Sequence, residues 1–96
     1  MKVKNMISDN GNKVPNQFII NGIHKGQEGN YFQSYNYVCA FIPSSGASVI
    51  IDEKWNTGKL NRSKTTGKYR NKFLNETKKE TQQKINSGVY ILTNLN

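Results

Sequence analysis

Residues 63–88 read SKTTGKYRNKFLNETKKETQQKINSG, and the architecture expected for the rest of the chain depends on this segment. It opens with hydroxyl side chains that can cap a helix, and it closes at Gly88, which is free to adopt the positive φ common after a helix. Between these ends, apolar residues recur every three or four positions, which predicts one amphipathic helix over residues 66–87. About 20 residues at ~1.5 Å each make a rod of roughly 30 Å.

The two sides of this predicted helix differ in character. At 100° per residue, one side carries the residues expected to pack on the domain: Tyr69, Phe73, Leu74, Thr77, Thr81 and Ile85. The other side carries a polar, mostly basic row: Lys64, Lys68, Lys72, Asn75 and Lys79. Glu76 and Glu80 lie four residues from Lys72 and Lys84, but they fall at the edge of the basic side. Much of the basic row therefore has no acidic partner. The row is either an ordinary solvated face or a stripe that contacts phosphates.

The net charge of +8 is unevenly distributed along the 96 residues. Residues 1–53 contain four lysines and four acids, which cancel. Residues 54–84 contain ten basic residues and two acids, so this third of the chain supplies the whole excess. Such asymmetry points to nucleic acid or another polyanion as the partner.

Length and composition predict one domain over residues 1–96, and an apolar fraction of only 34% leaves room for a homodimer. Cys39 is the one cysteine and lies in an apolar run, so we expect a buried thiol and no internal disulfide, as is typical of the cytosol. No apolar run approaches the ~18 residues that span a membrane. The N-terminus, MKVKNMISDNGN, lacks the apolar segment of a signal peptide. We therefore expect a cytoplasmic protein with no membrane partner.

Alternating or apolar segments predict strands over residues 1–7, 17–21, 31–42, 47–53 and 89–92. A Pro-Ser-Ser-Gly turn at residues 43–46 should join two of them as an antiparallel hairpin. The three-glycine segment GIHKGQEGN, residues 22–30, fits no phosphate-binding motif and is interpreted as a flexible connection. The expected fold class is α+β: a small antiparallel sheet of four or five strands packed by one long C-terminal helix, with a short final strand.

The residues that could carry out catalysis are few. His24 is the only histidine, so one chain cannot assemble a standard zinc site from His and Cys ligands. No serine has a lysine three residues later, and the adjacent Asp52 and Glu53 should point to opposite faces of a strand. We therefore predict a binding protein rather than an enzyme, with no cofactor and no metal.

The predicted binding surface combines a basic loop, KWNTGKLNR at residues 54–62, with the basic side of the helix. Hydroxyls and free N–H groups at the helix start could hold a phosphate beside the basic loop, or could simply cap the helix. Lysine predominates, which favours contact with the nucleic-acid backbone over the reading of bases, and six phosphate contacts would give a salt slope of roughly −5 on duplex DNA. The predicted nucleic-acid-binding residues are Lys59, Arg62, Lys64, Lys68, Arg70, Lys72, Asn75 and Lys79.

Aromatic residues gather in the segment YFQSYNYVCAFI, residues 31–42. Exposed rings would suit base stacking, whereas rings on one strand face more often pack a sheet under a helix. Trp55, beside the basic loop, is open to the same two interpretations: a lid on the core or a contact residue.

A block in the C-terminal half resembles small uncharacterised proteins from phages and mobile elements of low-GC Gram-positive bacteria. The block reads Ser-x-Thr-Thr-x-Lys-Tyr-Arg-x-x-Phe-Leu, and it is matched here by Ser63, Thr65, Thr66, Lys68, Tyr69, Arg70, Phe73 and Leu74. In that group it follows a strand and leads into a helix. Similar segments are FQSYN, DEKW and KINSGVYILTNLN, so the resemblance covers residues 31–96, although loop 56–61 is longer here.

The resemblance implies a context, a bacterial host cell and a phage or mobile-element gene, more than an activity. Two hypotheses follow. The first is a non-enzymatic accessory protein that binds DNA or RNA through the basic loop and helix. The second is a phage-encoded inhibitor that binds a host protein or nucleoprotein complex, for example an anti-CRISPR protein acting on an RNA-guided nuclease.

Overall fold

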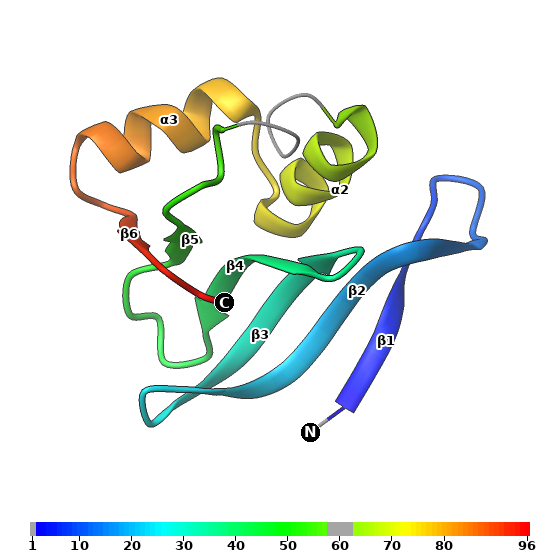
Figure 1. Ribbon diagram of the computed structural model, residues 1–96, viewed down its shortest axis with the longest axis horizontal. Helices are drawn as coiled ribbons and strands as arrows, with labels where there is room; N and C mark the ends of the chain where they lie inside the picture. The colour runs from blue at the N-terminus through cyan, green and yellow to red at the C-terminus, as the bar shows by residue number, and fades with distance from the viewer. Residues whose placement is uncertain (1, 58–62) are drawn as a thin grey trace.

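The computed structural model describes residues 2–57 and 63–96, and this part of the chain forms one sheet and two helices (Figure 1). In chain order the elements are β1 (Lys2–Ile7), β2 (Lys13–His24), β3 (Gln27–Ser34), β4 (Tyr37–Pro43), β5 (Ile50–Asp52), α2 (Lys64–Leu74), α3 (Lys78–Asn86) and β6 (Ile91–Thr93). The six strands lie in the order β1-β2-β3-β4-β5-β6. Neighbours are antiparallel from β1 to β5, whereas β6 pairs parallel to β5.

The predicted fold class, four or five antiparallel strands under one long helix, is therefore wrong. The sheet has six strands and is mixed, and the helix predicted over residues 66–87 is interrupted. Asn75 ends α2 in the left-handed conformation, with φ 56° and ψ 48°. Thr77 then caps α3: its hydroxyl accepts from the Glu80 N–H at 3.2 Å, and the Glu80 carboxylate accepts from the Thr77 N–H at 3.0 Å. This capping box stabilises a second helix start inside a continuous helical pattern.

The parallel pairing of β6 follows from the connection that precedes it. Both helices lie between β5 and β6, and this long crossover returns the chain to the end of the sheet where β5 begins. Ile50 pairs with Ile91, and Asp52 pairs with Thr93. A two-residue turn would instead have produced an antiparallel neighbour.

The glycine-rich segment predicted as a flexible connection is a tight hairpin between β2 and β3. Lys25 and Gly26 both have positive φ, 47° and 81°, as a two-residue turn with matching strand twist requires. Gly29 lies in β3 because there is no room for a side chain: a Cβ would stand 2.3 Å from the Ile42 carbonyl oxygen and 2.7 Å from the Phe41 ring. Glycine at this position therefore lets an aromatic ring cover the strand.

The aromatic segment predicted as one strand over residues 31–42 is two strands. Tyr35 has φ 55° and, with Asn36, forms the turn between the paired residues Ser34 and Tyr37. Most of the rings are packed: Phe32 and Phe41 are fully buried, whereas Tyr35 is 53% exposed. The core interpretation therefore describes this segment better than the stacking interpretation does.

The core lies between the sheet and α2. Phe32 of β3 stacks on Phe73 of α2 with ring centroids 5.6 Å apart. Beside this pair, a buried chain of hydrogen bonds joins Gln17, Ser34 and Thr66, at 2.9 and 2.7 Å, and so links β2, β3 and α2. The expectation of a buried thiol is confirmed, because Cys39 is 2% exposed and burial raises its pKa to about 11.

The chain end is held to the sheet by Asp52, which is fully buried. Its carboxylate accepts from the Leu95 N–H at 2.9 Å and from the Asn96 side-chain amide at 3.1 Å. It also accepts from the Tyr37 hydroxyl at 2.5 Å. Burial raises the pKa of Tyr37 to about 12, and the hydrogen bond to the Asp52 carboxylate is the second cause of this increase.

This raised pKa predicts a loss of stability at alkaline pH. The folded state holds the Tyr37 proton more tightly than the unfolded chain, whose tyrosine pKa is near 10. The stabilisation is therefore complete below about pH 10 and is lost as the pH rises through about 12. Urea unfolding at about pH 9 and 11 should show this loss, and Tyr37→Phe should show a smaller one. An equal loss in both proteins would mean that Tyr37 ionises as freely as in water.

Candidate nucleic-acid interface

Three of the predicted lysines form a row along one side of α2. Ser63 caps this helix by accepting from the Thr66 N–H at 3.2 Å, which fixes its first turn. Lys64, Lys68 and Lys72 then recur at intervals of four residues and are all exposed. They span about 12 Å of helix. No acidic residue lies in the first turn of α2, so the row begins without a local countercharge.

Lys72 also joins α2 to the turn between β1 and β2. Its Nζ donates to the Ile7 carbonyl at 2.6 Å and lies 3.2 Å from the Asp9 carboxylate. Both side chains of this ion pair are well exposed, and such pairs contribute only about 0–1 kcal/mol. A phosphate could therefore replace Asp9 at small cost.

The remaining predicted residues do not join this row. Arg70 is only 4% exposed, and its guanidinium lies 5.0 Å from the centre of the Trp55 ring, so it belongs to the core. Burial lowers its pKa. Asn75 is the exposed cap of α2, and Lys79 is exposed on the separate helix α3. Lys59 and Arg62 lie outside the described residues.

Trp55 is itself 5% exposed, which matches the core-lid interpretation. The helix turns 100° per residue, so Arg70 follows Thr66 and Tyr69 onto the inner side of α2 rather than the basic side. A cation on an aromatic ring with little water around it is attracted by the ring face. The predicted role of Arg70 at the surface is therefore incompatible with where the fold places it.

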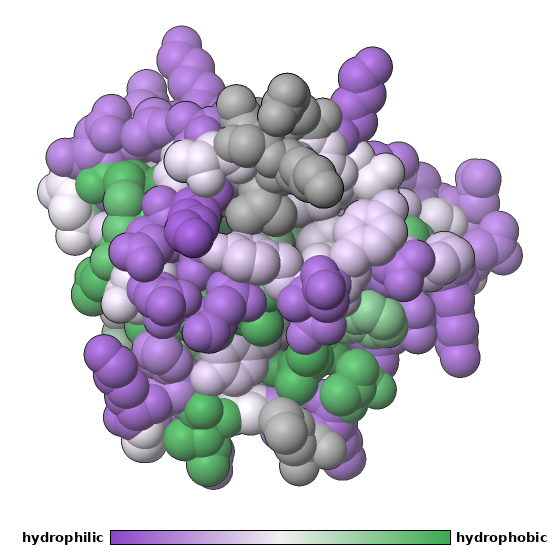
Figure 2. Space-filling model, viewed as in Figure 1, coloured by the Kyte–Doolittle hydropathy of each residue, from purple (hydrophilic) through white to green (hydrophobic). Residues whose placement is uncertain are grey.

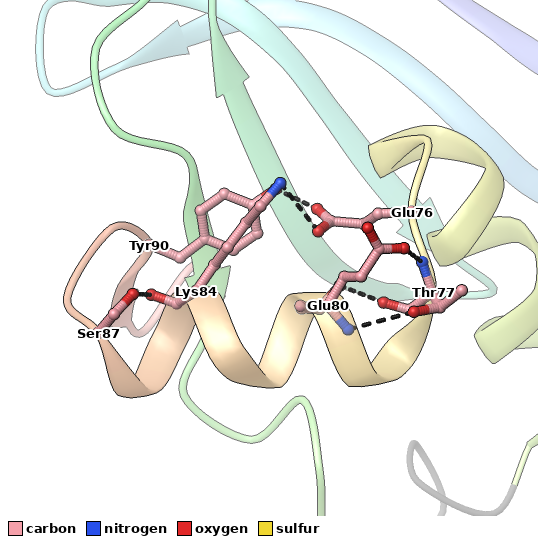
Figure 3. A network of polar contacts seen from close by, with 7 residues as sticks. Glu76, Thr77, Glu80, Lys84, Ser87 and Tyr90 are labelled. Carbon is pink, nitrogen blue, oxygen red and sulfur yellow. Dashed lines mark hydrogen bonds and ion pairs between the residues drawn. The ribbon is translucent and has the colours of Figure 1, made fainter.

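Charges on α3 are largely compensated within its own neighbourhood (Figure 3). Lys84 Nζ lies 3.1 Å from the Glu76 carboxylate, which also accepts a hydrogen bond from the Tyr90 hydroxyl. Glu80 takes part in the capping box, and the hydrogen bond from the Thr77 N–H lowers its pKa. This helix is therefore a poorer anion-binding surface than α2.

The fold adds three lysines that the distribution of charge along the sequence did not single out. Lys4 and Lys13 line the same hollow as Lys72, and Lys2 lines the adjoining one. They come from β1 and β2, in the half of the chain whose net charge is zero. The period-two alternation of Lys2, Lys4 and Met6 was the available signal, because it places all three on one face of β1. We call the combined set the basic track: Lys64, Lys68, Lys72, Lys13, Lys4 and Lys2.

The two hollows form a groove on the helix-facing side of the sheet, beside α2. Each has a volume of about 650 Å³, and they share Lys4, Ile19 and Asn30. The apolar part of the first hollow's lining consists of Met6, Ile7, Ile19, Ile42 and Phe73, and Val3 adds to the second. In the surface view, hydrophobic patches show among hydrophilic side chains over the strands that the helices leave uncovered (Figure 2). We call the two adjoining hollows together the strand groove.

A family model matches residues 1–88. The chain belongs to that family, which is described as a family of unknown function (DUF8033). No curated protein and no solved structure matches the chain. The matched residues of the DUF8033 family include both helices and the strands that form the groove, so the whole basic track lies within the family's region.

Within residues 2–57 and 63–96, no three His, Cys, Asp or Glu side chains gather into a group that could hold a metal ion. Among the described helices, none is both long and apolar enough to cross a membrane.

Proposed function

We propose that this protein is a non-enzymatic accessory protein of a phage or mobile element that binds nucleic acid in the cytoplasm of a bacterial host. The observation that carries the proposal is the basic track, which gathers six lysines from α2, β1 and β2. Lysine is a compact point charge that suits phosphate oxygens, so contact with the nucleic-acid backbone is the role that this track favours. The phage or mobile-element context rests on the sequence block at residues 63–74.

Binding through this track should depend strongly on salt. Each phosphate neutralised by a lysine releases counterions, and six contacts correspond to a slope of roughly −5 on duplex DNA or −4 on a single strand. Fluorescence anisotropy with short DNA and RNA at about 50 and 200 mM salt measures this slope directly. Failure of every ligand to bind at the lower salt would remove the proposal.

The double variant Lys64→Glu/Lys68→Glu tests the surface itself. Both side chains are exposed, so we expect the fold to survive while affinity falls and the salt slope becomes shallower by about 2. Lys72 is left unchanged because it also joins the helix to the first hairpin. The matched control is Lys25→Glu/Lys54→Glu, which reverses two exposed charges outside the track. If the control loses as much affinity, binding follows net charge and not this surface.

A second candidate is the protein-binding inhibitor of host defence or replication machinery, such as an anti-CRISPR protein. The observation that favours it is the apolar end of the sheet, where Val89, Ile91 and Leu92 are exposed at and just before β6. A protein partner, or a second copy of this chain, would bury them. This candidate predicts weak binding to free nucleic acid and capture of a nucleoprotein complex that persists in high salt.

A further inference from the structure

Resting on the proposed function, we infer that the strand groove holds unpaired nucleobases, so that the preferred ligand is a single strand and not a duplex. The inference concerns the part of the surface that the row on α2 does not explain. That row alone would serve any phosphate backbone. The groove beside it has a different lining.

The apolar lining is the first observation. Ile19 and Ile42, both half-buried, line the groove from β2 and β4, and the half-buried Phe73 lines it from α2. Met6 of β1 also borders it but is itself buried in the core. A duplex presents charged backbone outward and keeps its bases stacked inside, so it would cover this lining with phosphates and gain nothing from it. A single strand exposes base faces, which bind apolar and aromatic side chains with little regard to sequence.

Two amides in the groove are the second observation. Asn21 and Asn30 are exposed and are directly paired across β2 and β3. Both line the groove, and each side chain offers a donor and an acceptor. Such groups match the Watson–Crick edges of unpaired bases, whereas in a closed duplex these edges bond to one another.

The position of the lysines is the third observation. Lys4 and Lys13 line the same hollow as the apolar residues, with Lys72 reaching it from α2. Lys2 and Lys4 continue along the second hollow. Phosphates can therefore follow the lysines while the bases turn inward to the apolar lining.

The experiment compares a thymidine oligomer of about 10 nucleotides with a hairpin duplex of similar charge, both at about 50 mM salt. We expect the single strand to bind at least about tenfold more tightly. Asn30→Asp places a negative charge in the groove and should weaken single-strand binding about tenfold, with a smaller effect on the duplex. The control is Asn86→Asp on α3, which retains an oxygen to accept from the Gln82 amide.

A second readout locates the bases without relying on any variant. An oligomer that carries 5-bromouracil, irradiated on the native protein, should crosslink to the groove residue Phe73, as mapped by mass spectrometry. Crosslinks confined to other segments would overturn the inference. Equal binding of both ligands with no effect of Asn30→Asp would also overturn it, while leaving the proposed function intact. No binding of either ligand would overturn both.

Discussion

Replacing Phe32 with alanine is expected to lower the free energy of unfolding by about 3–5 kcal/mol. The ring is fully buried in the middle of the sheet, between β2 and β4, and it stacks on Phe73 of α2. Its removal takes apolar surface out of the core and leaves a cavity beneath the helix that the rigid sheet cannot close. Because Phe73 also lines the strand groove, the same cavity should loosen the groove.

Urea unfolding, with a check that the slope on denaturant is unchanged, measures the effect of Phe32→Ala. Phe18→Ala on the neighbouring strand is the matched control. Phe18 is only half-buried and lies on the opposite face of the sheet, so the same change there should cost about 1 kcal/mol. Similar losses in the two variants would mean that the helix does not rest on Phe32.

Replacing Asp52 with asparagine is expected to lower the free energy of unfolding by about 3 kcal/mol. The buried carboxylate accepts hydrogen bonds from the Tyr37 hydroxyl, from the backbone N–H groups of Lys54 and Leu95, and from the Asn96 amide. An asparagine presents an NH₂ group where two oxygens now accept, so at least one buried donor would face another donor. Each buried polar group left unpaired in this way costs about 1–3 kcal/mol.

Glu53→Gln is the control for this change, since Glu53 is adjacent in sequence and exposed. Its effect should stay within about 0.5 kcal/mol. Limited proteolysis adds a local readout: in Asp52→Asn, the last residues should be cleaved faster, because the Leu95 and Asn96 contacts to this carboxylate are weakened. Unchanged stability together with unchanged cleavage would show that the carboxylate does not anchor the chain end.

The proposed interface explains why a domain with a small apolar fraction leaves apolar residues in a groove. Ile19 packs against the margin of the core, and both Ile19 and Ile42 stay only half-buried. Both residues share the hollows with lysines and asparagines. This combination favours a ligand with both charged and apolar parts, which describes a single-stranded nucleic acid.

Features set by residues near one another in the chain could be predicted from the sequence. Ser63 caps α2, and Gly88 adopts positive φ after α3, because capping needs only a few consecutive residues. The break at residues 75–77 was equally local, with an asparagine followed by a Thr-x-x-Glu capping box. Periodicity alone predicts one helix here, because the helical period of the apolar residues continues across the break. The prediction of a flexible connection at residues 22–30 is wrong for a different reason. Gly29 leaves room for the Phe41 ring of the neighbouring strand, and a contact between strands cannot be seen in the local sequence.

Three features could be predicted from local sequence: the capped ends of the helical segment, the burial of Cys39 and the concentration of positive charge in residues 54–84. The tertiary structure decided which charges share a surface. It buried Arg70 against Trp55, and it brought Lys4 and Lys13 to the same groove as Lys72. Caps and helical periods depend on neighbours in the chain, whereas strand register and helix packing join residues as far apart as Ile7 and Lys72, 65 positions from each other.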